Sequence, residues 1–345
     1  MQEARQSGEY AGSKLQLIWA LYVGKLFYKL RGIMRLVFFK YVLVLTLFGT
    51  TIFSVFAESG NPYLYILGVA QDAGYPQAGC YESHCMPGWN DVHLRRGTVS
   101  LGLIDPETNQ KYMFEATPNF PAQLFDLELE APAERFKLAG IFLTHAHIGH
   151  YSGLMFLGHE AMGTLNLPVY AMPRMSQFLK TNGPWSQLVT YKNIILEPLQ
   201  NGETQILGRL KVTPFLVPHR DEYSETVGYR IDGPNKSAIF IPDIDKWSEW
   251  QTDISDLIKT VDYALIDATF FSDRELPGRD MSKIPHPFVT ESMEALKKLS
   301  HEERNKVWFI HMNHTNPLLN SNSRESQRVQ SEGFNIATEG KRLIL

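Results

Sequence analysis

The sequence contains little cysteine and no run of basic residues. Cys80 and Cys85 are the only cysteines among 345 residues, which excludes a fold held together by a disulfide framework. The formal net charge is −4 and no stretch is rich in Lys and Arg, so the electrostatic footprint of a nucleic-acid-binding protein is missing. We therefore expect no nucleic-acid partner, whereas a small molecule, including a phosphorylated one, is compatible with this composition.

A long apolar run lies near the start of the chain, at residues 36–56. A basic start at Met34 precedes it, and small residues follow it up to Ala57, a pattern typical of a secretory signal peptide. An uncleaved membrane anchor is the alternative, because the run is long enough to span a bilayer. We predict that residues 1–57 form one or the other, with Met34 as the true start of a signal peptide. Residues 58–345 would then form one domain that is periplasmic or secreted, with contact to a membrane only through this N-terminal segment.

Short apolar runs and helical patterns are mixed through the rest of the chain. The run at 138–143 is bounded by Thr144 and reads as a buried strand. Because strands and helices alternate without an interdomain linker, one α/β domain with two stacked sheets fits better than two domains. Further strands are predicted at 63–69, 98–104, 112–115, 168–171, 194–196, 210–214, 226–231, 238–241, 263–267 and 307–310, and helices at 121–127, 153–162, 174–181 and 290–299.

Three histidines follow the predicted strand 138–143, in the segment LTHAHIGHYSGL. Imidazole is the commonest side-chain ligand of zinc and related ions. His145 and His147 are two residues apart, so in a tight loop they can flank one ion. His150 lies at the start of the next predicted helix and can face a neighbouring ion. The cluster therefore predicts a metal site.

Further candidate ligands occur where other predicted strands end. His219 follows one apolar strand, Asp243 follows a second in AIFIPDID, and His311 follows a third in KVWFIHMNH. Residues at several strand ends converge at one edge of a sheet, where catalytic sites of α/β folds are commonly built. Each of these residues taken alone is more often structural, but their order after the histidine cluster is specific.

This order of histidines and aspartate resembles the metallo-β-lactamase superfamily, from about residue 62 to the end of the chain. The resemblance implies an αββα sandwich, that is, an α/β fold of two stacked mixed sheets flanked by helices, with one or two metal ions at its edge. Zinc is the expected metal, with manganese or iron as alternatives. The resemblance implies a first metal bound by His145, His147 and His219, a second bound by His150 and His311, and Asp243 bridging the two.

The chain departs from the superfamily pattern at Gly149. The family usually has an aspartate there, two residues after the second histidine, which ligates the second metal and orients the attacking water. The pattern therefore leaves the choice between one and two metals open. Asp72, in the loop after the first predicted strand, is a candidate substitute carboxylate, although a role in a turn is more common for such a residue.

The segments LGVAQDAGYPQAGCYESHC and FIHMNHTNPLL are similar to a narrower group. They resemble the pyrroloquinoline quinone biosynthesis protein B group and the cyclic phosphodiesterase of phosphonate breakdown. This resemblance implies a structural zinc held by Cys80, Cys85 and His314, with Glu82 or His84 as the fourth ligand. A Cys80–Cys85 disulfide is the alternative, because the relatives have a cysteine at the position of Glu82 and an oxidising compartment favours a disulfide.

One more histidine, His286, precedes the predicted helix 290–299 in the segment SKIPHPFVTESMEAL. In phosphodiesterases of the superfamily, a histidine at this position contacts the substrate phosphate or protonates the leaving group. A histidine can serve as a general acid near neutral pH. Asp267, at the end of a predicted strand, is expected to support the site from behind the ligands.

The leading hypothesis from these residues is hydrolysis of a phosphodiester or related ester. The metal would lower the pKa of a bound water toward about 7 and so provide hydroxide, with Asp243 and His286 as the catalytic residues. Two alternatives stay open: an iron-dependent oxygenase-type enzyme related to quinone cofactor biosynthesis, since the same ligands suit iron, and a non-catalytic binding or carrier protein. The sequence does not reveal the substrate or the oligomeric state.

Overall fold

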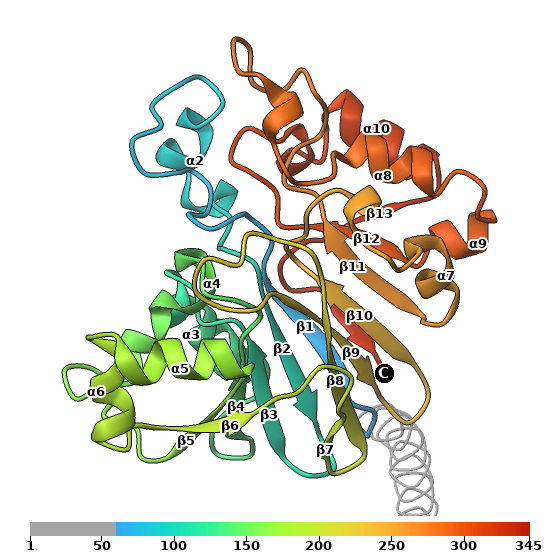
Figure 1. The fold of residues 1–345 in the computed structure, drawn as a ribbon. Coiled ribbons are helices and arrows are strands. Elements are labelled where there is room, and N and C mark those ends of the chain that lie inside the picture. The colour runs from blue at the N-terminus through green and yellow to red at the C-terminus, as the bar shows by residue number, and fades with distance from the viewer. Residues whose placement is uncertain (1–59) are drawn as a thin grey trace, which may run out of the picture. The chain divides into compact units, whose positions relative to one another are not determined.

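The computed structural model describes residues 60–345 (Figure 1). The signal peptide or anchor predicted at residues 1–57 lies outside the described residues, so it stays a prediction. Within residues 60–345, no helix combines the length and apolar character needed to cross a bilayer.

The first of two sheets has seven strands in the order β14-β1-β2-β3-β4-β5-β6. Pairing is antiparallel from β14 to β3 and parallel from β3 to β6. The last strand of the chain therefore lies beside the first one. The strands are β1 (Tyr63–Gly68), β2 (Ser100–Asp105), β3 (Gln110–Phe114), β4 (Lys137–Phe142), β5 (Leu167–Ala171), β6 (Ile194–Pro198) and β14 (Arg342–Ile344).

The second sheet also has seven strands, in the order β13-β12-β11-β10-β9-β8-β7. Strands β10 to β13 are parallel to one another, and β7 to β10 pair antiparallel. As a result, β8, β10, β11 and β12 all run in one direction. The strands are β7 (Gln205–Leu207), β8 (Leu210–Leu216), β9 (Val227–Asp232), β10 (Ser237–Ile241), β11 (Tyr263–Asp267), β12 (Val307–Ile310) and β13 (Asn335–Ile336).

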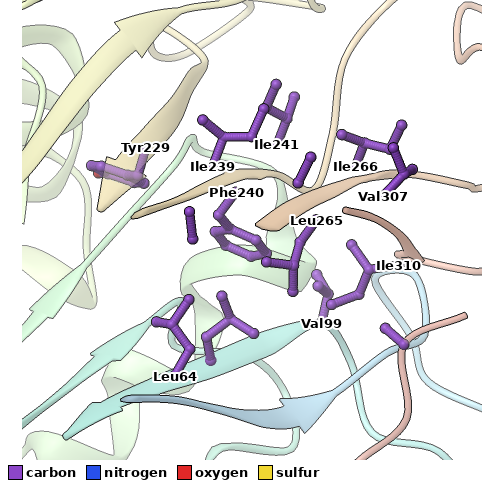
Figure 2. Packing of buried hydrophobic residues seen from close by; sticks show 14 of the residues in the cluster. Leu64, Val99, Tyr229, Ile239, Phe240, Ile241, Leu265, Ile266, Val307 and Ile310 are labelled. Atoms are coloured by element: carbon purple, nitrogen blue, oxygen red, sulfur yellow. The ribbon is translucent and has the colours of Figure 1, made fainter. Parts of the chain in front are cut away.

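The inner faces of the sheets form the larger apolar core. Figure 2 shows Phe240 and Leu265 pointing from the second sheet toward Leu64 of the first sheet. On β10, the neighbouring Ile239 and Ile241 point the other way, because successive side chains of a strand alternate between its faces. All five side chains are fully buried, and this packing holds the sheets face to face.

Helices cover both outer faces of the sandwich (Figure 1). Helices α3, α5 and α6 pack on the first sheet, and α7, α8 and α10 pack on the second. This layering confirms the predicted αββα sandwich. The helices are α2 (Met86–Asn90), α3 (Phe120–Glu130), α4 (Ile148–Tyr151), α5 (Pro173–Thr181), α6 (Trp185–Thr190), α7 (Ile254–Lys259), α8 (Val289–Ala295), α9 (His301–Arg304) and α10 (Arg324–Ser331).

The helix predicted at 153–162 is a 3₁₀ helix at Ser152–Leu157, followed by turns. The backbone N–H of Gly153 donates to the carbonyl of Ala116 instead of to a helical partner. A Cβ atom at Gly153 would lie 2.1 Å from the carbonyl oxygen of Thr117, so the chain passes too close to this loop for a larger residue. The prediction was wrong in type because this contact outweighs the helical spacing of the apolar residues.

Candidate metal centre

The candidate ligands lie where strands of both sheets end. His145 follows β4, His219 follows β8, Asp243 follows β10 and His311 follows β12. Within each sheet these strands run in one direction, so their carboxyl ends lie at the same edge. The two edges meet, and side chains far apart in sequence converge there.

The first ligand group consists of His145, His147, His219 and Asp243, whose ligand atoms all lie within 4.8 Å of one another. Nδ1 of His147 lies 2.8 Å from Nε2 of His145 and 3.2 Å from Nε2 of His219. Oδ2 of Asp243 lies 3.3 Å from Nε2 of His145 and 3.2 Å from Nε2 of His219. Tetrahedral zinc with bonds of about 2.0–2.1 Å places its ligand atoms about 3.3 Å apart. The spacing of these four atoms therefore fits a zinc-sized ion.

Hydrogen bonds behind the rings decide which nitrogen faces the centre. Nδ1 of His145 lies 2.9 Å from Oγ1 of Thr144, whose hydroxyl donates to Glu115 at 2.5 Å. Nδ1 of His219 lies 2.9 Å from a carboxylate oxygen of Asp245. Each Nδ1 therefore carries a proton that it donates outward, and each Nε2 keeps a lone pair for a metal.

His147 faces the centre with the opposite ring nitrogen, Nδ1. Its Nε2 lies 3.1 Å from a carboxylate oxygen of Glu222, so Nε2 donates outward and Nδ1 keeps the lone pair. In the neutral tautomers that these outward contacts favour, three lone pairs and one carboxylate oxygen face one another. Such an arrangement is repulsive unless a cation lies between them, either a proton, as the raised pKa of His219 indicates for the metal-free protein, or a metal ion, which this donor set fits.

The second ligand group consists of Asp72, His150 and His311, with ligand atoms also within 4.8 Å of one another. Oδ1 of Asp72 lies 3.2 Å from Nε2 of His150. Nδ1 of His311 lies 2.9 Å from Oγ1 of Thr269, and that hydroxyl donates to Asp267 at 2.7 Å. A histidine bonded to a threonine that is bonded to a carboxylate, here called a threonine relay, also occurs at His145 in the first group. The relay at His311 leaves its Nε2 to face the centre.

Asp243 lies between the two groups. Its Oδ2 is 3.7 Å from Nε2 of His150, besides its contacts with His145 and His219. Burial alone would raise the pKa of Asp243, but the surrounding histidines, His219 first, outweigh burial and hold the pKa well below its usual range. Burial likewise opposes the charge on His219, yet Asp243 raises the pKa of His219 to about 9. The carboxylate therefore strongly favours positive charge at this place.

Two residues of the site have left-handed backbone conformations that side-chain-bearing residues rarely adopt. The φ angle is 69° at His311 and 74° at Glu115. Both residues immediately follow a strand, β12 and β3 respectively, and both are completely buried. Such strain persists only where the surrounding structure enforces it, and it commonly lies at functional sites.

His286 faces two carboxylates. Its Nδ1 lies 2.8 Å from Oδ2 of Asp267 and 3.1 Å from Oδ1 of Asp243. Burial would lower the pKa of His286, but Asp267 and Asp243 outweigh burial and raise it well above the usual value. The proton on Nδ1 is therefore fixed, and Nε2 is the ring atom available to a substrate. Asp267 also forms a group with Asp243 and His311 whose ligand atoms lie within 4.8 Å of one another, so its supporting role behind the ligands stays a prediction.

The predicted structural-zinc ligands meet at one place, where the structure shows the alternative that the sequence left open, a disulfide. Cys80 and Cys85 are joined by a disulfide, and in this state their sulfurs cannot bind zinc as thiolates. The ring Nε2 of His84 lies 3.4 Å from Sγ of Cys80, and His314 completes the group. The residue beside the cysteines is thus His84 and not Glu82. A zinc at this place stays a prediction, for the reduced protein.

Several residues of the centre were not predicted from the sequence. Their shared role is to accept or relay the outward hydrogen bonds of the ligand histidines. Thr144 directly precedes the first ligand and Asp245 lies two residues after Asp243, so their place at strand ends was an available signal. The missed residues are Glu115, Thr144, Glu222, Asp245 and Thr269.

The fold and the centre together define a class: αββα proteins with a metal-binding edge. Residues 104–312 match the beta-lactamase superfamily domain, and this match spans more than half of the chain. The chain belongs to this superfamily.

Among curated proteins, the chain is similar to coenzyme PQQ synthesis protein B. The protein from Methylobacterium sp. (strain 4-46) is 25% identical over 305 residues, which cover 81% of this chain and 99% of that protein. The protein from Acinetobacter baumannii (strain ACICU) is 24% identical over 320 residues, which cover 82% of this chain and 100% of that protein. These matches confirm the resemblance to the pyrroloquinoline quinone biosynthesis protein B group.

Solved structures share the fold. Zn²⁺-bound PqqB from Methylobacterium extorquens superposes with a TM-score of 0.69 at 23% identity, covering 82% of this chain and 100% of that chain. A diphosphatase of the PhnP family superposes with a TM-score of 0.58 at 21% identity, covering 83% of this chain and 97% of that chain. At these identities the likeness concerns the fold alone.

Proposed function

We propose that the chain is a zinc-dependent hydrolase that acts on a phosphodiester or a related ester. The observation that carries the proposal is the position of Asp243, whose carboxylate contacts ligands of both groups. A carboxylate shared by two adjacent ligand groups can bridge a pair of metal ions, and such a pair would stabilise both the attacking and the leaving oxygen of a hydrolysis. Membership of the superfamily supports the proposal as well, because the family match spans the ligands from His145 to His311.

Zinc is the proposed metal because the ligands are mainly imidazoles and their spacing suits zinc. The PqqB structure that shares this fold contains zinc. When bound, such an ion lowers the pKa of a coordinated water and polarises a phosphoryl or carbonyl oxygen. Manganese and iron accept the same donors and stay alternatives.

His286 is proposed as the proton donor to the leaving oxygen. Asp267 and Asp243 hold its Nδ1, which orients the ring and leaves Nε2 toward the substrate side. The proton moves from Nε2 to the leaving oxygen as the ester bond breaks, and the two carboxylates stabilise the ring while it is charged. The residue is 7% exposed, so this proton transfer takes place largely shielded from bulk water.

Exposed apolar side chains lie next to the ligands in the chain. Ile148, directly after His147, is 67% exposed. Tyr223, directly after the His147 partner Glu222, is 62% exposed, and its ring centroid lies 5.6 Å from that of Phe178. Exposed apolar groups beside a polar centre favour a substrate with an apolar portion. We therefore propose an ester that carries an aromatic or aliphatic group.

The test uses purified protein stripped of metal and then reloaded with zinc. Bis(p-nitrophenyl) phosphate, p-nitrophenyl phosphate and p-nitrophenyl acetate separate phosphodiesterase, phosphomonoesterase and esterase activity. Turnover of the diester that depends on zinc and disappears in His219→Ala supports the proposal. His301→Ala is the matched control, because His301 is exposed on α9. Absence of zinc-dependent turnover with all three esters would reject the proposal.

A second candidate function is iron-dependent oxidation. Similarity to coenzyme PQQ synthesis protein B favours it, because that name concerns a quinone cofactor. Histidine and carboxylate ligands also suit iron. Metal analysis of protein purified without added metal, combined with a measurement of dioxygen consumption, separates the two candidates, since oxidation requires bound iron and consumes dioxygen, whereas hydrolysis consumes no dioxygen with any of these metals.

A further inference from the structure

Gly149 and Asp72 compete for the same space. A Cβ atom at position 149 would lie 2.4 Å from both Cα and Oδ1 of Asp72, and 2.8 Å from its Cβ. Atoms that are not bonded to each other do not approach so closely. No side chain fits at position 149 while Asp72 has this position, so the glycine in the histidine cluster and the aspartate of a distant loop form one structural unit.

Asp72 is aimed into the second ligand group. Its Oδ1 lies 3.2 Å from Nε2 of His150. One ligand atom from each of Asp72, His150 and His311 lies within 4.8 Å of the other two. Within residues 60–345, Oδ1 of Asp72 and Nε2 of both histidines are buried and make no hydrogen bond. Both histidines are fully buried. Oδ1 of Asp72 and Nε2 of His150 are thus at ion-pair distance without hydrogen-bond geometry, Nε2 of His311 has no hydrogen bond, and a shared cation would satisfy all three.

The backbone holds Asp72 in this place through pairing with the second sheet. Ala70 forms a bridge with Met312, the residue after the ligand His311. The N–H of Met312 donates to the carbonyl of Val69 at 2.8 Å, and the N–H of Gln71 donates to the carbonyl of Met312 at 2.8 Å. The loop after β1 is therefore tied to the strand end that carries a ligand, and Asp72 is not an ordinary turn residue.

We propose that Asp72 is the carboxylate ligand of the second metal ion and that Gly149 is the residue that makes room for it. The superfamily usually has an aspartate where this chain has Gly149. In this chain the carboxylate comes from the loop after β1, but it still lies beside His150. This inference rests on the proposed function of the edge as a metal centre. The site would accordingly hold two ions, although the sequence pattern alone left the number open.

The test is the number of zinc ions per chain after equilibration at fixed free zinc. The protein is kept without reductant, so that the Cys80–Cys85 disulfide stays closed and adds no site. We expect two ions in the unmodified protein and one in Asp72→Asn, with second-site affinity at least about tenfold weaker. Asp256→Asn is the matched control, because Asp256 is 75% exposed on α7, and it should keep both ions.

Two further variants keep the proposal falsifiable if Asp72→Asn folds poorly. Gly149→Ala removes no acid, but its Cβ would displace Asp72, so it should also lose one ion. The double variant Asp72→Gly/Gly149→Asp returns the acid to position 149 and should regain the second ion. Two ions with unchanged affinity in Asp72→Asn, or a single ion in the unmodified protein, would overturn the proposal. If Asp72→Asn and Gly149→Ala each lose one ion as expected, but the unmodified protein hydrolyses no ester, the proposed function is rejected and the role of Asp72 as a ligand stands.

Discussion

Nδ1 of His286 lies 2.8 Å from Oδ2 of Asp267, a contact that fixes the orientation of the ring at the edge of the metal centre. His286 belongs to neither ligand group. We therefore predict that His286→Ala lowers kcat by about 10²–10⁴-fold, the usual contribution of a general acid, while zinc content stays unchanged. Steady-state kinetics and metal analysis of the same sample check this. Full activity in His286→Ala would show that the residue does not donate the proton.

The two threonine relays lead to a second prediction. Thr144 links His145 to Glu115, and Thr269 links His311 to a buried carboxylate. Thr144→Val and Thr269→Val keep the side-chain shape but remove the hydroxyl, so each should weaken zinc binding about 10–100-fold. Competition with a chromogenic chelator measures the change. Thr→Ser at both positions is the control and should bind zinc as tightly as the unmodified protein; equally tight binding by the valine variants would contradict the relay.

A third prediction concerns Glu275, which belongs to none of the ligand groups described above. It accepts hydrogen bonds from the backbone N–H of Phe271 and the hydroxyl of Thr315. Burial raises the pKa of Glu275 from 4.5 to about 7. Between these two values the folded protein holds a proton that the unfolded chain has lost, so the free energy of unfolding falls as pH rises from about 4.5 to 7.

Glu275→Gln removes this titration and keeps the shape of the side chain. The difference in stability between the variant and the unmodified protein should therefore shift in favour of the variant, by about 1–3 kcal/mol, between pH 5 and pH 8. Urea unfolding at both pH values measures it. A difference that is the same at both pH values would show that Glu275 ionises normally in the folded protein.

A fourth prediction concerns the disulfide. Reduction frees two thiols next to His84 and His314, which together match the ligands of a closed structural zinc site. We expect the reduced protein to bind one more zinc per chain than the oxidised protein, as measured by metal analysis after gel filtration. Cys80→Ser/Cys85→Ser should show no such gain. Equal zinc content in the oxidised and reduced protein would show that the cysteines serve only as a disulfide.

Much of the centre could be predicted from the sequence because its ligands follow short apolar strands. His145, His219, Asp243 and His311 each stand at the end of such a run, and parallel strands bring these ends together. The αββα layering was predicted from the resemblance to the metallo-β-lactamase superfamily, because β10 is apolar on both faces and its sequence does not separate the inner face from the outer face.

The sequence offered Asp72 only as a candidate substitute carboxylate, because its position beside Gly149 depends on pairing between residues far apart in sequence. The bridge between Ala70 and Met312 joins the loop after β1 to the end of β12. Only this contact shows that the space above Gly149 is filled by a carboxylate. The sequence could not decide between Glu82 and His84 as the fourth ligand beside the two cysteines either, because side chains in a loop do not alternate in direction with a fixed period.

A zinc titration of metal-free protein, with turnover of bis(p-nitrophenyl) phosphate recorded at each step, tests whether this edge is a two-ion hydrolytic centre. We expect tight binding of two ions per chain and turnover that reaches its maximum only when the second ion is bound. A protein that binds two zinc ions and hydrolyses no ester, or that is purified with iron and consumes dioxygen, would contradict this expectation.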